Sequence, residues 1–143
     1  MRLSDSDELL FRQVHPTFVR DGRVGSQAFR PTAKDEGCLS VARGALTTPR
    51  QAYHHHTGTV GLDSAGTWAV SVGECGTLSL VAFEDPIAAS AEAPADPAHA
   101  FIDFRELSRS HAEARGMKLA RLATSRGRLF PEPDTGGAAP SDT

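Results

Sequence analysis

Cysteine and lysine are scarce in this chain of 143 residues, and long apolar runs are absent. The only two cysteines, Cys38 and Cys75, are too few for the disulfide framework of a small secreted domain, so we expect reduced thiols. No apolar stretch approaches the roughly 18 residues that a membrane-spanning helix needs. The polar, acidic first residues also lack the basic and apolar regions of a secretory signal. These absences favour a cytoplasmic protein that has no membrane partner.

The scarcity of lysine leaves arginine to carry most of the positive charge. Lys34 and Lys118 stand beside thirteen arginines, and the formal net charge is −3. Basic residues concentrate in residues 105–128, which hold seven basic and two acidic side chains. The acidic total argues against a dedicated nucleic-acid-binding protein, whereas the local concentration is compatible with a basic binding surface.

The length favours one folded domain followed by a tail. A domain usually has roughly 100–200 residues, and we place a single domain at residues 1–130. Residues 84–98 are rich in alanine, proline and acidic side chains and are interpreted as a low-complexity loop within it. Residues 131–143 contain no large apolar side chain, so a disordered tail is predicted there.

Alternation of apolar residues predicts five strands, at residues 8–15, 38–42, 67–72, 77–83 and 100–104. Strands 67–72 and 77–83 are expected to form a hairpin around the Gly-flanked residues 73–76. Thr48 and Pro49 predict the start of a short helix over 49–56, because a threonine hydroxyl caps free amides and proline suits the first helical position. A long helix is predicted over 108–126, with small residues on its inner side.

These elements predict an α+β fold. We expect a mostly antiparallel sheet of four or five strands, with the long C-terminal helix packed on one face and the short helix at an edge.

The segment 17–37 is the first candidate for a ligand-facing or partner-facing loop. It is long and polar, and connections of more than about 12–15 residues are usually functional or disordered. Its basic side chains are candidates for binding a phosphate or another anion: Arg20, Arg23, Arg30 and Lys34.

Arg12 and His15 lie in the first predicted strand, close to its polar end. A charged side chain in a strand that starts apolar must reach solvent, a carboxylate or a ligand, because an unpaired buried charge is very costly. An internal salt bridge from Arg12 to Glu74 or Asp103 is one solution. The other is a pocket in which Arg12 and the loop arginines bind an anionic group, with Glu74 or His15 as acid or base.

The turn at residues 73–76 places Glu74 and Cys75 side by side at a strand end, where scaffolds often present reactive groups. A thiolate nucleophile there would need a depressed pKa and a nearby base, and His15 and His99 are the available histidines. A hairpin loop with a half-buried cysteine is the simpler interpretation.

The segment Leu10-Phe11-Arg12-Gln13-Val14-His15-Pro16 resembles the opening of RES-type and related ADP-ribosyltransferase-like toxins. In that family an arginine near the N-terminus, a serine and a glutamate surround a nicotinamide dinucleotide. Arg12 matches the arginine, and Ser40 and Glu74 would take the other two places. The resemblance covers these seven residues of the chain.

Two further clusters suggest different chemistry. The run 54–56 contains three consecutive histidines, which point about 100° apart on a helix and cannot converge on one metal ion. No metal site is therefore predicted, and the sequence implies no cofactor. The basic helix 108–126 resembles a phosphate-tracking stripe without the aromatic residues that stack on single-stranded bases. Its candidate partner-binding side chains are Arg109, Arg115, Lys118 and Arg121.

Two functional hypotheses follow. The first is a non-enzymatic interaction module that binds a protein or nucleic-acid partner through loop 17–37 and helix 108–126. The second is a small enzyme that acts on a phosphorylated or nucleotide substrate. Its hallmark would be one concave pocket lined by Arg12, His15, Arg30 and Glu74.

Overall fold

The computed structural model describes residues 1–133 and confirms the α+β fold, with a five-stranded antiparallel sheet at its centre. The order of the strands across the sheet is β5-β1-β4-β7-β6. Their bounds are β1 Leu9–Val14, β4 Cys38–Arg43, β5 Gly66–Ser71, β6 Val81–Glu84 and β7 His99–Asp103. The predicted disordered tail falls largely on residues 134–143, which lie outside the described residues.

Three α-helices accompany the sheet: α1 Pro49–His54, α2 Val72–Thr77 and α3 Arg109–Arg126. The predicted start of α1 is confirmed, since Thr48 Oγ1 accepts a 3.1 Å hydrogen bond from the Gln51 amide. A π-helical turn, His55–Val60, extends α1 beyond its last residue. None of the helices in residues 1–133 is both long and apolar enough to cross a bilayer.

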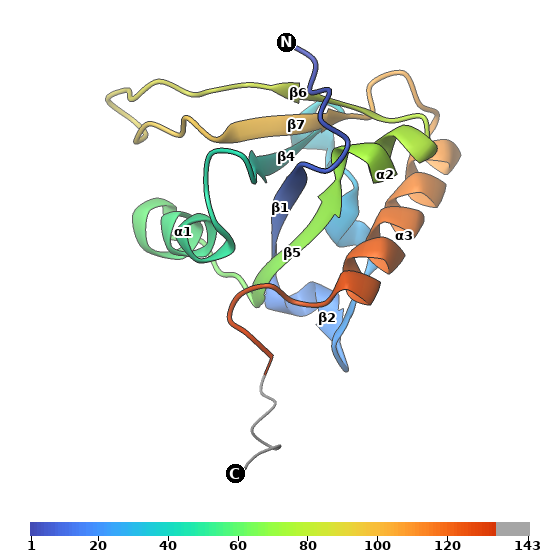
Figure 1. The fold of residues 1–143 in the computed structure, drawn as a ribbon, viewed down its shortest axis with the longest axis horizontal. Coiled ribbons are helices and arrows are strands. Elements are labelled where there is room, and N and C mark those ends of the chain that lie inside the picture. The colour runs from blue at the N-terminus through green and yellow to red at the C-terminus, as the bar shows by residue number, and fades with distance from the viewer. Residues whose placement is uncertain (134–143) are drawn as a thin grey trace.

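The two faces of the sheet are covered differently, with α3 on one side and α1 on the other (Figure 1). On the α3 side, Leu10 and Val70 pack with Leu119 in the main core, and all three are fully buried. On the α1 side, Phe11 packs with Ala52 of α1 in a much smaller cluster over β1 and the edge strand β5. Because successive side chains of β1 point to opposite faces of the sheet, this strand contributes to two hydrophobic clusters of very different size.

The predicted hairpin between residues 67–72 and 77–83 is wrong. Residues 72–77 form α2, and the strands on either side of it, β5 and β6, lie at opposite edges of the sheet. Ser71 and Glu74 form a capping box, in which the Glu74 amide donates to Ser71 Oγ at 3.0 Å and the Ser71 amide donates to Glu74 Oε1 at 2.8 Å. This Ser-x-x-Glu signature of a helix start outweighs the two flanking glycines, which suggested a turn.

The segment 17–37 folds back against α3. It contains two short paired strands, β2 Val19–Arg20 and β3 Arg23–Val24, and three 3-10 turns. Phe29 in the turn Ser26–Phe29 is fully buried. A side chain at Gly116 of α3 would meet the Phe29 carbonyl oxygen at 3.2 Å, so the small residue at this position lets the turn approach the helix. The segment is thus a structural layer as well as a connection.

The last described residues return to the edge strand β5. The Thr67 amide donates to the Phe130 carbonyl at 2.7 Å, and the Leu129 amide donates to the Thr67 carbonyl at 2.8 Å. Phe130 also packs edge-to-face on Tyr53 of α1, with ring centroids 5.1 Å apart. Gly66 has a φ of 150°, and a side chain there would meet the Phe130 carbonyl at 2.8 Å. Leu129 and Phe130 therefore tie α1 to the sheet.

Candidate functional site

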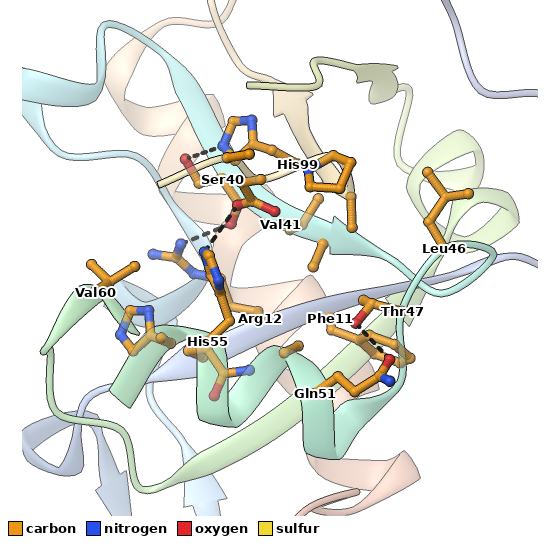
Figure 2. Close-up of a pocket in the computed structure, with 18 residues that line it drawn as sticks. Phe11, Arg12, Ser40, Val41, Leu46, Thr47, Gln51, His55, Val60 and His99 are labelled. Atoms are coloured by element: carbon orange, nitrogen blue, oxygen red, sulfur yellow. Dashed lines mark hydrogen bonds and ion pairs between the residues drawn. The ribbon is translucent and has the colours of Figure 1, made fainter. Parts of the chain in front are cut away.

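A cavity of about 430 Å³ opens on the α1 side of the sheet. It lies between α1 with its π-helical turn, strands β1 and β4, and the end of the connection from β6 to β7 (Figure 2). Its polar lining is Arg12, Gln13, Ser40, Thr47, Gln51, His55, His56, Asp96 and His99. Apolar residues supply the rest of the wall, among them Leu46 and Val60, which are 56% and 46% exposed.

The splaying of β1 and β4 brings Arg12 into this cavity. The two strands pair at Leu10–Arg43 and Phe11–Ala42, and the pairing ends there. Beyond that point the guanidinium of Arg12 lies between the strands, where Nη1 donates to the Ser40 carbonyl at 2.9 Å. Nε donates to the Ala28 carbonyl at 2.8 Å, so the segment 17–37 supports Arg12 through its backbone. The guanidinium thus satisfies the Ser40 carbonyl in the gap between the two strands and the Ala28 carbonyl of the segment 17–37.

The charge of Arg12 is not neutralised by a carboxylate. Within residues 1–133, no acidic side chain lies within ion-pair distance of its guanidinium, and the predicted salt bridges to Glu74 and Asp103 are not formed. Burial lowers the pKa of Arg12, an effect that the charge of Asp35 opposes. The two hydrogen bonds to carbonyls use two of the five guanidinium N–H groups, which leaves donors available to a ligand.

Two of the three consecutive histidines, His55 and His56, line the cavity and are half-buried instead of lying at a solvated helix end. Burial lowers the pKa of His56; the backbone of Asp63 opposes this shift, and the charges of Arg12 and His55 add to it. His55 Nε2 lies 3.7 Å from Asp96 Oδ2 across the cavity mouth. His56 is therefore a neutral hydrogen-bonding group at neutral pH.

Ser40 and His99 lie together on the opposite wall of the cavity (Figure 2). His99 Nε2 is 3.2 Å from Ser40 Oγ. The other ring nitrogen, Nδ1, is 3.1 Å from Asp85 Oδ2 and 3.1 Å from the Asp85 carbonyl. The three residues come from adjacent strands or their ends, because β7 lies between β4 and β6.

The predicted acid–base residues Glu74 and His15 lie apart from the cavity. Arg126 holds Glu74 through hydrogen bonds of 2.8 and 3.1 Å. Burial alone would raise the pKa of Glu74, but the hydrogen bonds from Arg126 and Ser71 outweigh it and the pKa is lowered. His15 is exposed and lies 3.9 Å from Asp63. With Arg30 also outside, the four residues of the predicted enzyme pocket do not share one concavity.

The predicted anion-binding residues of segment 17–37 are spread over separate surfaces. Arg30 Nη1 lies 3.3 Å from Glu113 of α3, beside a shallow hollow between that helix and the turn Ala33–Asp35. Arg20 and Arg23 face each other across the β2–β3 pair and are exposed. Lys34 is exposed as well. Arg12 is the predicted ligand-binding residue that reaches the cavity.

The basic helix uses part of its charge internally. Arg115 Nε donates to the Leu78 carbonyl at 2.7 Å, and Arg109 lies 3.3 Å from Glu113 on the same helix. Lys118 and Arg121 are exposed. Arg115 is therefore engaged by the backbone, while Arg109, whose side chain is 93% exposed, stays at the surface together with Lys118 and Arg121.

Cys75 is fully buried in the main core, and burial raises the pKa of its thiol to about 12. An inert, neutral thiol results, so the predicted reactive turn at 73–76 does not carry nucleophilic chemistry. Among residues 1–133, no group of three His, Cys, Asp or Glu side chains is arranged to hold a metal ion.

Sequence reasoning found Arg12 but missed Ser40 as a paired group and missed His99, His56 and Asp85 as members of one region. Ser40 and His99 are 59 positions apart, and their contact depends on β4 and β7 being neighbours. The available signal was that Ser40 alternates with buried residues in the predicted strand 38–42 and that His99 directly precedes the predicted strand 100–104. It indicates a shared face only once the strand order is known.

Comparisons of the chain with known protein families, curated proteins and solved structures give no match.

Proposed function

We propose that the cavity binds a small anionic molecule, with Arg12 as the group that holds its charge. The observation that carries this proposal is the half-buried guanidinium of Arg12, bonded to two carbonyls and to no carboxylate of the described chain. A cation withdrawn from water is costly unless a negative group meets it. A carboxylate or phosphate oxygen in the cavity supplies that group through charge-assisted hydrogen bonds.

The remaining lining defines the class of ligand. Apolar side chains cover much of the wall, and the neutral His56 and the Gln51 amide are among the polar groups that line it. A volume of about 430 Å³ lies within the range of small-molecule sites, which combine apolar walls with a few placed polar groups. The ligand is therefore a compact amphipathic acid or phosphate ester.

Titration of isotopically labelled protein with adipate, inorganic phosphate and adenosine monophosphate tests this proposal by NMR. We expect saturable shifts at the Arg12 side-chain Nε–H and at the amides of Ser40 and His56. Arg12→Met should weaken binding by at least about tenfold, because a charge-assisted pair contributes about 1.5–3 kcal/mol.

Arg2→Met is the matched control, since it removes an exposed arginine that neither lines the cavity nor belongs to a candidate binding surface. Binding should be unchanged in this variant. Absence of a saturable shift with all three probes, or equal affinities for wild type and Arg12→Met, would contradict the proposal.

A second candidate function is binding of nucleic acid on the α3 side. The Val24 amide donates to Thr124 Oγ1 at 3.1 Å, so the β2–β3 pair packs directly on α3. This contact joins the exposed Arg20 and Arg23 to the helix that carries Arg121. The packing of this strand pair on α3, with exposed arginines on both, supports the interaction-module hypothesis.

Fluorescence anisotropy with a labelled duplex, measured at several salt concentrations, tests the second candidate. Phosphate contacts release counterions, so affinity should fall steeply with added salt. Exchange of Arg23 and Arg121 for glutamine should weaken binding and lower the salt slope by about two. Affinity unaffected by this double substitution would exclude the surface, and Arg12→Met provides a control at a separate site.

A further inference from the structure

His99 lies between Ser40, which lines the cavity with it, and Asp85, which stands behind it. Nε2 of its ring faces the Ser40 hydroxyl at 3.2 Å, and Nδ1 faces the Asp85 carboxylate at 3.1 Å. Ser40 is exposed and lines the cavity, so a ligand can reach its hydroxyl. His99 is held more firmly, with a side chain that is 17% exposed.

The partners of the His99 ring fix the position of its proton. Both groups facing Nδ1, the carboxylate and the carbonyl of Asp85, can only accept a hydrogen bond when the carboxylate is ionised. Nδ1 therefore carries the hydrogen of the neutral ring, and Nε2 presents its lone pair to Ser40 Oγ. A serine nucleophile, its general base and an orienting carboxylate need this arrangement.

The position of Arg12 adds a second element to this series. Its Nη1 lies 2.9 Å from the carbonyl of Ser40, so a positive charge stands beside the serine inside the same cavity. A ligand whose negative group meets Arg12 is thereby held next to the Ser40 hydroxyl. Positioning of this kind turns a reaction between two molecules into a step within one complex.

We propose that Ser40, His99 and Asp85 hydrolyse carboxylic esters whose acyl part carries a negative charge. The requirement for a charged acyl part rests on the anion-binding role proposed for Arg12. In this assignment Ser40 is the nucleophile, His99 is the general base and acid, and Asp85 is a positioning residue.

The reaction has two balanced steps. Ser40 Oγ forms a bond to the ester carbonyl carbon, His99 Nε2 takes the hydroxyl proton, and the bond to the leaving alcohol breaks as the alcohol receives that proton. Water then attacks the acyl-serine and gives a proton to Nε2, which returns it to Ser40 Oγ as the acyl bond breaks. The products are the carboxylic acid and the alcohol, and the protein is regenerated.

A neutral fluorophosphonate probe tests the nucleophile without any need for anion binding. Attack by Ser40 Oγ on phosphorus displaces fluoride and leaves a stable phosphonyl adduct. We expect a single adduct by intact-protein mass spectrometry, located at Ser40 by peptide mapping. Ser40→Ala should abolish it, and His99→Gln should slow labelling by at least about a hundredfold.

Matched controls separate the series from the rest of the surface. Ser110→Ala and His111→Gln change an exposed serine and an exposed histidine at the start of α3, and both should label at the wild-type rate. Circular dichroism verifies that each variant is folded. No adduct on folded wild-type protein, an adduct at another residue, or labelling that does not depend on His99 would overturn the assignment.

The role of Asp85 has its own readout. Asp85→Asn should lower kcat for ester hydrolysis by at least about tenfold with little change in KM, because the carboxylate orients His99 and does not touch the ester. Asp85→Glu should recover part of kcat. Equal changes in kcat and KM, or an unchanged kcat, would remove Asp85 from the assignment.

The charge requirement is tested with the mono-p-nitrophenyl ester of adipic acid and its methyl ester, after subtraction of the uncatalysed rate. The two substrates differ chiefly in the charge of the remote group. Wild type should favour the acid in kcat/KM by at least about tenfold, and Arg12→Met should lose this preference while still reacting with the fluorophosphonate. Inorganic phosphate should compete with the acid.

The two proposals fail in different ways. Fluorophosphonate labelling at Ser40 without preference for the charged ester would support the nucleophile and overturn the anion site. Binding of adipate without labelling would support the anion site and overturn the nucleophile.

Discussion

The two sides of the sheet treat charge differently. On the α3 side, where the main core lies, Arg126 is bonded to Glu74 at 2.8 Å, and Arg30 is paired with Glu113 at 3.3 Å. On the α1 side, the guanidinium of Arg12 has carbonyl partners only. Arg12 is thus a half-buried arginine whose guanidinium has carbonyl partners only and lines the cavity, whereas Arg126 and Arg30 each have a carboxylate partner. This contrast supports the proposal that an anion binds beside Arg12.

The same contrast exists along the β1–β4 pair. At one end Arg43 donates to both carboxylate oxygens of Glu8, at 2.9 and 3.1 Å. At the other end the strands separate around Arg12. One arginine therefore fastens the two strands, and the other occupies the gap between them.

The largest expected effect concerns the main core on the α3 side, where Cys75 is buried. A rise of the Cys75 pKa from 9.0 to about 12 lowers the thiolate fraction roughly a thousandfold, and burial also excludes reagents. In a Cys38→Ser variant, alkylation by iodoacetamide at pH 8 should be at least about a thousandfold slower in native protein than in urea. Mass spectrometry measures both rates. A native alkylation rate within about tenfold of the unfolded rate would show that the reagent reaches Cys75 in the folded protein.

The next largest effect is on stability and comes from the Glu8–Arg43 ion pair, which joins one end of β1 to β4. Glu8→Gln should lower the free energy of unfolding by about 2–3 kcal/mol, since it leaves the partly buried Arg43 without its main counter-charge. Urea denaturation measures the change. The control is Glu84→Gln, whose carboxylate is 38% exposed and 3.4 Å from Arg43, and which should cost less than about 1 kcal/mol. Equal costs would show that burial of the Glu8 pair is not important.

The Glu74–Arg126 pair gives the smallest effect, visible as a pH dependence. Because the folded state lowers the pKa of Glu74, its contribution is present above the unfolded value of about 4.3 and is lost as pH falls through the folded pKa. Glu74→Gln should therefore lose stability at pH 7 and much less at pH 3. Urea midpoints at the two pH values measure this. If Glu74→Gln lost the same stability at pH 7 and at pH 3, the loss would come from altered packing and not from the charge of Glu74.

Much of the fold was predictable because local signals and tertiary packing agree. The first strand, the strand that starts at Cys38 and the long helix after Ser108 follow from alternation and capping. The hairpin failed because the residues after Ser71 satisfy two local rules at once, a glycine-flanked turn and a capping box. Only packing of Cys75 into the core decides between them.

The candidate site was less predictable for a physical reason. Arg12 could be identified because a charged side chain in an apolar strand requires a partner. Its actual partners are backbone carbonyls, which sequence does not distinguish from one another. The Ser40–His99 contact follows from the strand order β4-β7-β6, which is set by long-range pairing. Neither residue belongs to a local motif.

The return of residues 129–130 to β5 has a consequence for self-association. An edge strand with free amides and carbonyls is a template for pairing with another chain, and proteins protect such edges in several ways. Here Leu129 and Phe130 occupy the bonding groups of Thr67 and also hold Tyr53 in place. A chain cut after Arg126 would lose both contacts. The β5 edge would be free to pair with another chain, and α1, which forms one wall of the cavity, would lose its support, so one truncation would cause both aggregation and collapse of the cavity.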